Sequence, residues 1–239
     1  MRKEKVEFDG GGLTLRGDLF IPRSDTKKVA VLFIHGWTGK PNNLAAEVVA
    51  AEGYNALTFS FEGHNNSDGS MDTITRKSAL NNAVKAYDFL REAVGPESKI
   101  VVVGNSFGGY IAALLTTVRE CSDISLRVPA NYLDQRMDEP QNGQGHENPK
   151  VTEWRLKKLD HSSTEALHSV HNFTGHIQII EAEMDELIPH QTVKNFVDAC
   201  SDSAKVDYHV MAGWPHSLSS HEGRNKEFQE LLISWLKEL

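Results

Sequence analysis

Short apolar runs alternate with longer stretches of helical periodicity along most of this chain. Residues 29–34 form an unbroken apolar run, which is typical of a strand buried on both faces. Residues 73–94 carry apolar side chains at three- and four-residue spacing, which predicts a long helix. This alternation predicts an α/β fold with a mostly parallel central sheet flanked by helices. Strands are expected at 6–8, 13–21, 55–61, 99–103, 124–128, 177–181 and 206–211, and further helices at 42–52, at 107–117, from 189 and along a C-terminal stripe ending at 239.

One segment breaks the alternation. From residue 130 to 172 the composition shifts toward Asn, Gln, Gly and Pro, and residues 138–149 are nearly devoid of apolar side chains. A long irregular stretch inside a compact domain usually serves function. We therefore expect a single domain over residues 1–239, with a small cap at 130–172 inserted over the active end of the sheet.

Composition and charge narrow the class of protein. Lys and Arg number 25 against 33 Asp and Glu, a net charge of −8, so the basic face of a nucleic-acid binder is not expected. No apolar run approaches the roughly 18 residues of a membrane span, and no signal core follows the N-terminus, so we expect a cytoplasmic protein with no membrane partner. Cys121 and Cys200 are too few for a disulfide framework and lack metal-site spacing, which favours free thiols.

The sequence GNSFG at residues 104–108 matches the pattern G-x-S-x-G. The string alone is weak evidence, because about one random chain in ten of this composition would contain it. Its position is more informative, since it follows an apolar strand and opens an apolar helix, the turn that lifts a serine hydroxyl above a sheet. Ser106 is therefore the candidate nucleophile, and an ordinary glycine-rich turn is the alternative.

A serine hydroxyl needs a neutral imidazole to accept its proton and a carboxylate to orient that imidazole. Asp185 follows an apolar strand and precedes a helix start near Pro189, and His216 lies between the last strand and the last helix. The order Ser106, Asp185, His216 is that of a hydrolytic triad on an α/β sheet. The alternatives are Glu183 and Glu186 for the acid and His209 and His221 for the base.

A site that binds an oxyanion is expected where the central strand ends. The sequence HGWTG follows that strand at residues 35–39, so a backbone amide there can point at a developing negative charge. We expect the amides of Trp37 and Phe107 to be the two donors. His35 is expected to hydrogen-bond the loop backbone and not to act as a base.

Together these features resemble the α/β-hydrolase superfamily. The resemblance rests on His35-Gly36, Gly104 to Gly108, Asp185 followed by Ile188-Pro189, and His216. Within the superfamily, residues 35–39, 63–69 and 104–109 are similar to small bacterial feruloyl/cinnamoyl-type esterases and their dienelactone-hydrolase-like relatives. The chain departs from those esterases at 60–65, where SFEGHN replaces Asp-x-Arg or Asp-x-Asn before Gly-His-Gly, and from dienelactone hydrolases proper in having Ser106 in place of Cys.

The resemblance implies a carboxylic ester hydrolase of the EC 3.1.1 type that acts on a small-molecule ester without cofactor or metal, as a monomer or homodimer. It also implies that the insertion lies between strands six and seven and covers an acyl pocket. Candidate pocket residues are Arg127, Tyr132, Met137 and Trp154, with packing or a strand-end ion pair as their alternative roles. Other activities open to the same triad are C–C bond, thioester and peptide hydrolysis, and a catalytically silent binding module is the alternative of another class.

Overall fold

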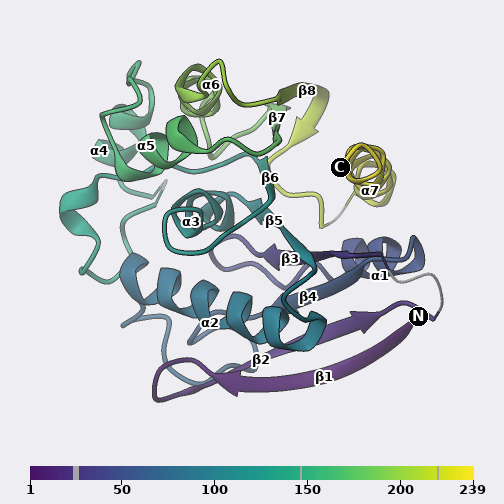
Figure 1. Cartoon of the computed structure of the whole chain (residues 1–239). Coiled ribbons are helices and arrows are strands. Elements are labelled where there is room, and N and C mark those ends of the chain that lie inside the picture. Colours follow the sequence, from purple (N-terminus) through teal and green to yellow (C-terminus); the bar gives the residue numbers. More distant parts are fainter. Residues whose placement is uncertain (24–26, 146, 220) are drawn as a thin grey trace.

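The computed structural model describes residues 1–23, 27–145, 147–219 and 221–239. These residues form one eight-stranded sheet in the order β1-β2-β4-β3-β5-β6-β7-β8 (Figure 1). The strands are β1 (Arg2–Asp9), β2 (Thr14–Ile21), β3 (Val29–Ile34), β4 (Asn55–Phe59), β5 (Lys99–Asn105), β6 (Asp123–Arg127), β7 (Ile177–Met184) and β8 (Val206–Pro215).

The sheet is mostly parallel, as predicted. β1 pairs antiparallel with β2, and β2 pairs antiparallel with β4, whereas every later pairing is parallel. β3 lies between β4 and β5, which confirms the prediction of a central strand at residues 29–34. The carboxyl ends of β3, β5, β6, β7 and β8 therefore lie along one edge of the sheet, where ligands bind in open α/β sheets.

Helices cover both faces of the sheet (Figure 1). Side chains of β3 alternate between two cores: Val31 and Phe33 join the core that holds α1 and α7, and Leu32 and Ile34 join the core that holds α2 and α3. This double burial explains the unbroken apolar run. The helices are α1 (Asn43–Ala51), α2 (Arg76–Val94), α3 (Phe107–Leu115), α4 (Pro149–Arg155), α5 (Glu165–Asn172), α6 (His190–Ala199) and α7 (Glu222–Leu236). None of the helices in the described ranges combines the length and the apolar character needed to cross a bilayer.

The predicted insertion falls between β6 and β7 and divides into two parts. Its first part is irregular and contains a short 3-10 helix, Asp134–Arg136, followed by α4; residue 146 lies outside the described residues. Its second part, α5, packs against α3 and α6 and buries Leu167 and Val170 in the main core. Helix α5 thus belongs to the layer over the sheet, because its apolar side chains recur at helical spacing, and the cap-like part ends before Thr164.

Candidate active site

Ser106 occupies a strained turn between β5 and α3. Its backbone has φ 55° and ψ −115°, a region that non-glycine residues rarely adopt and that clusters at functional sites. The crowding requires glycine on both sides: a Cβ at Gly104 would lie 2.3 Å from the Gly108 carbonyl oxygen, and one at Gly108 would lie 2.2 Å from the Ile34 carbonyl oxygen. The turn therefore has the tight strand-to-helix geometry that the sequence motif predicts.

Asp185 and His216 meet at the ends of the neighbouring strands β7 and β8. His216 Nδ1 lies 2.8 Å from Asp185 Oδ2 and 3.0 Å from Oδ1, and the two side chains are only 12% and 4% exposed. The main-chain N–H groups of Leu187 and Ile188 donate to Asp185 Oδ1 at 2.9 and 2.7 Å, which fixes the carboxylate. Because a carboxylate accepts, the neutral imidazole carries its proton on Nδ1 and keeps the lone pair of Nε2 for a substrate or nucleophile proton.

The alternative acids hold the loop and do not contact the imidazole ring. Glu183 Oε2 accepts the Gly213 N–H at 2.7 Å, and Glu186 Oε2 accepts the His216 main-chain N–H at 3.2 Å. His209, an alternative base, lies within β8 opposite Ile180. These positions favour Asp185 and His216 over the other acids and His209 as the interacting pair.

Arg127 connects the serine turn to the histidine loop, a role that sequence reasoning did not find. It ends β6 and is buried; its Nε donates to Asn105 Oδ1 at 3.1 Å and its Nη1 donates to the His216 carbonyl at 3.0 Å. Its own carbonyl accepts the Ser106 N–H at 2.9 Å. One guanidinium thus sets His216 beside the residue that precedes Ser106. Within the described residues no direct hydrogen bond joins the Ser106 hydroxyl to His216, and such bonds are often long before substrate binds.

The loop after β3 lies against the serine turn. A Cβ on Gly36 would lie 3.4 Å from Ser106 Cβ, so the backbone of this loop approaches the serine closely. His35 Nε2 accepts the Phe61 N–H at 3.2 Å and its Nδ1 lies 2.8 Å from the Gly36 carbonyl, which confirms its predicted structural role. Burial lowers the pKa of His35 to about 4, so the ring is neutral near pH 7.

The predicted oxyanion donors flank this contact. The Trp37 ring packs edge-on against Phe107, with centroids 5.5 Å apart. In the described part of the chain neither the Trp37 N–H nor the Phe107 N–H donates to another main-chain or side-chain group. Two free amides on adjacent loops at the serine turn are what an oxyanion site requires.

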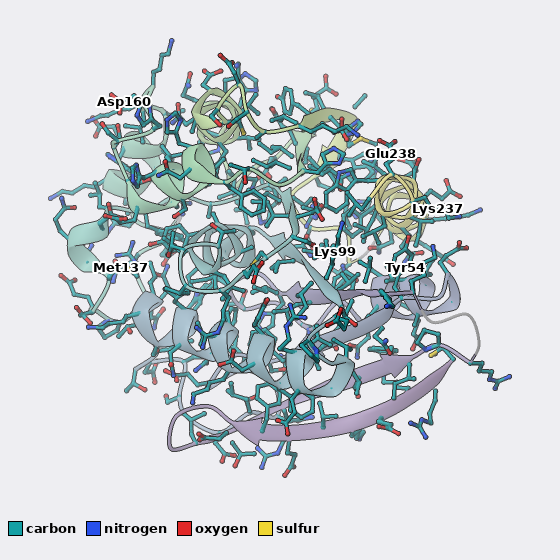
Figure 2. All side chains as sticks on the ribbon, viewed as in Figure 1. Tyr54, Lys99, Met137, Asp160, Lys237 and Glu238 are labelled. Carbon is teal, nitrogen blue, oxygen red and sulfur yellow. The ribbon has the colours of Figure 1, made fainter. Side chains whose placement is uncertain are left out.

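The predicted pocket residues are spread over several environments. Arg127 lies within the sheet layer, and Tyr132 is buried with its ring against Phe107 and Tyr110, at centroid distances of 6.0 and 4.9 Å. Met137 is partly buried on the insertion, at the outer margin of the view in Figure 2. Trp154 is half-buried in α4. Of these four, Arg127 is hydrogen-bonded to the serine turn, and Tyr132 reaches it through its ring contact with Phe107.

No candidate metal centre accompanies the site: within the described ranges no three His, Cys, Asp or Glu side chains are grouped so that they could hold an ion. Cys121 and Cys200 are free thiols, and burial raises the pKa of each to about 12. Neither thiol is therefore suited to act as a nucleophile near pH 7.

Comparison with known proteins agrees with this architecture. The sequence model of the family described as "alpha/beta hydrolase fold" matches residues 29–120, and none of the curated protein sequences matches the chain. A serine hydrolase homologue from Coxiella burnetii superposes with TM-score 0.72 at 21% identity, covering 99% of this chain and 98% of that one. An esterase from Pyrococcus furiosus gives 0.74 at 20% identity, over 99% and 90%. Est1E from Butyrivibrio proteoclasticus, solved with ferulic acid bound, gives 0.72 at 17% identity, over 97% and 99%.

Proposed function

The chain is an α/β hydrolase in its fold, and on that premise we propose that it is a serine-dependent carboxylic ester hydrolase in which Ser106, His216 and Asp185 carry the reaction. The observation that carries the proposal is the pairing of a strained serine turn with a buried Asp185–His216 hydrogen bond on the same sheet edge. The strain at Ser106 has a use in this reaction, because it presents the hydroxyl above the sheet.

In the proposed first half-reaction, His216 Nε2 accepts the Ser106 proton while the serine oxygen attacks the ester carbonyl carbon. Asp185 holds the imidazole in the required tautomer and stabilises the imidazolium that forms. The amides of Trp37 and Phe107 bind the oxyanion of the tetrahedral intermediate. His216 then donates its proton to the departing alcohol, which leaves an acyl group on Ser106.

In the second half-reaction water takes the place of the alcohol. His216 removes a proton from the water as it attacks the acyl carbonyl, the same two amides bind the second oxyanion, and the proton returns to Ser106 as the acid leaves. Arg127 touches none of the reacting atoms in this scheme. It holds the His216 main chain and the residue before Ser106 in register, and so acts as a positioning residue.

The similarity to Est1E supports an ester with an aromatic acyl group as one substrate to test, together with simple alkyl esters. The experiment measures hydrolysis of p-nitrophenyl esters from acetate to laurate, and of methyl ferulate, by the parent, Ser106→Ala and Ser203→Ala. Ser203 is an exposed serine between α6 and β8 and serves as the matched control. The proposal expects turnover by the parent and Ser203→Ala, and a loss of nearly all turnover in Ser106→Ala.

Equal turnover by Ser106→Ala and the parent would overturn the proposal. Absence of ester turnover in a folded parent would also contradict it, and would direct the assay to the other bonds that such a triad cleaves. Parallel assays of an anilide, a thioester and a dienoate C–C substrate distinguish peptidase, thioesterase and C–C hydrolase activity. No turnover of any of these would favour a silent binding module.

A further inference from the structure

Two arginines lie buried together where the insertion meets the main domain. Arg76 begins α2 and Arg155 ends α4, and they are only 1% and 2% exposed. Both guanidinium carbons lie about 5 Å from the centroid of the same ring, that of Tyr132 (5.0 Å for Arg76 and 4.9 Å for Arg155). The two positive charges therefore share one aromatic side chain and lie within about 10 Å of each other.

Most of the hydrogen-bonding capacity of this pair is unused. Arg76 Nε and Nη1 and Arg155 Nη2 are buried without a partner in the described residues. The hydrogen bonds that these two guanidinium groups do make are long. Arg76 Nη2 donates to Gln144 Oε1 at 3.3 Å, and Arg155 Nε donates to the Asn131 carbonyl at 3.3 Å. A neighbouring donor, Asn131 Nδ2, is also buried and unpaired, and the Tyr110 hydroxyl has only the Arg76 guanidinium beside it. Burial of so many donors without acceptors is costly, so the arrangement needs an acceptor-rich group.

No carboxylate of the described residues supplies that group. Neither guanidinium lies within 4.0 Å of an Asp or Glu oxygen in the described ranges. Asp134 interacts electrostatically with Arg76. Its Oδ2 accepts the Glu165 N–H at 3.0 Å, and its Oδ1 is buried without a partner. Burial raises the pKa of Asp134. Even with Asp134 ionised, two arginines and one carboxylate leave an excess positive charge.

The arginine pair is linked to the serine turn by aromatic contacts. The Ser106 carbonyl accepts the Ala130 N–H at 3.1 Å, and Tyr132, two residues further on, places its ring against Phe107. Contacts therefore run from the serine turn through Phe107 and the Tyr132 ring to both guanidinium groups. A planar carboxylate matches the paired N–H groups of a guanidinium, whereas an uncharged chain end would leave them unsatisfied.

We propose that Arg76 and Arg155 form a subsite for a carboxylate carried by the acyl part of the substrate, so that the enzyme prefers esters of dicarboxylic acids over neutral esters of equal length. This inference rests on the proposed ester hydrolase function. Gln144, a residue of the insertion, accepts a hydrogen bond from Arg76 Nη2 when no substrate is bound. The substrate carboxylate would replace that amide oxygen and engage the free donors as well.

The test compares matched ester pairs: mono-p-nitrophenyl succinate, adipate and suberate against p-nitrophenyl butyrate, hexanoate and octanoate, each corrected for uncatalysed hydrolysis. We expect the parent to show at least a tenfold higher kcat/KM for the best hemiester than for its neutral partner. Arg76→Met and Arg155→Met should each lower that ratio by about 10- to 100-fold, the value of a charged hydrogen bond. Arg136→Met is the matched control, because that insertion arginine is only partly buried and pairs with Glu139.

A second measurement tests anion binding by the parent itself. Adipate should raise the thermal unfolding midpoint of the parent and inhibit neutral-ester hydrolysis competitively, and uncharged hexanamide at equal ionic strength should do neither. A parent that hydrolyses neutral esters but shows no preference for hemiesters and no response to adipate would overturn the subsite while leaving the hydrolase function intact. A parent that hydrolyses no ester, but is still stabilised by adipate in a way that Arg76→Met abolishes, would overturn the hydrolase function and support the anion site.

Discussion

The guanidinium of Arg127 donates to the main-chain carbonyl of His216 at 3.0 Å, and its Nε donates to Asn105 at 3.1 Å. The arginine thereby ties the end of β8 to the end of β5, two strands that do not pair with each other. Burial lowers the pKa of Arg127 to about 10, an effect that the nearby Asp185 charge opposes, so the side chain is still charged near pH 7. Arg127 therefore links the proposed base to the serine turn, in addition to the contacts that Asp185 and Glu186 make with His216.

Arg127→Lys should lower kcat by about 10- to 100-fold with little change in KM, because lysine keeps the charge but cannot reach both acceptors in a fixed planar geometry. Steady-state kinetics on the best ester measures the effect. Arg119→Lys is the control, since Arg119 pairs with Asp88 on the surface. A kcat for Arg127→Lys equal to that of the control would show that the link has no role in positioning His216.

Replacing the proposed acid should have a far larger effect than replacing its neighbour. Asp185→Asn removes the charge that fixes the His216 tautomer, so kcat should fall on the order of a thousandfold or more. Glu186→Gln loses only a main-chain contact to His216, and we expect a change of less than about tenfold. The two variants are compared in one ester assay. The reverse order of effects would assign the acid to Glu186.

The serine turn should tolerate no side chain at its glycines. Gly104→Ala would bring a Cβ to 2.3 Å from the Gly108 carbonyl oxygen and should lower the free energy of unfolding by about 1–3 kcal/mol. Gly223→Ala, in α7 with no atom within 4 Å of the new Cβ, should instead raise it by up to about 1 kcal/mol. Urea unfolding measures both. Equal stability of the two variants would contradict the close approach of β5 and α3.

His35 should make the fold sensitive to acid. Its folded pKa of about 4 lies below the ordinary value of 6.5, so the unfolded chain binds its proton first as the pH falls. The stability from neutral His35 is complete above pH 6.5 and is lost between 6.5 and 4, by about 3 kcal/mol in all. Urea unfolding of the parent and His35→Gln at pH 7 and pH 4 tests this. The parent should lose about 3 kcal/mol more than the variant, and identical losses would count against a buried neutral ring.

The elements that position the site were largely predictable from the sequence, because each carries a local signal. The apolar run before Gly104 marks a buried strand, and the glycines around Ser106 mark the close approach of strand and helix. Asp185 and His216 follow strands whose parallel arrangement brings their carboxyl ends to one edge. These signals lie within short stretches of chain, so no knowledge of the tertiary packing was needed to find them.

The contacts between distant segments could not be predicted in the same way. The direction of the Arg127 side chain depends on the register of β6 between β5 and β7. That register cannot be inferred from the sequence of the three strands alone. Arg76 and Arg155 are far apart in the chain and resemble ordinary surface arginines of two helices until the insertion folds over Tyr132. The polar composition before helix α5 obscures its short apolar stripe at Leu167 and Val170, so the sequence alone places this helix in the cap.

The proposed reaction requires Ser106 to be a nucleophile activated by His216 and Asp185. Reaction with a fluorophosphonate probe, followed by peptide mass spectrometry, tests it without any assumption about the substrate. We expect one phosphonyl group on Ser106 of the parent, none in Ser106→Ala, and much slower labelling of His216→Gln at pH 7. Labelling of a different residue, or equal labelling of the parent and Ser106→Ala, would show that Ser106 is not the activated nucleophile.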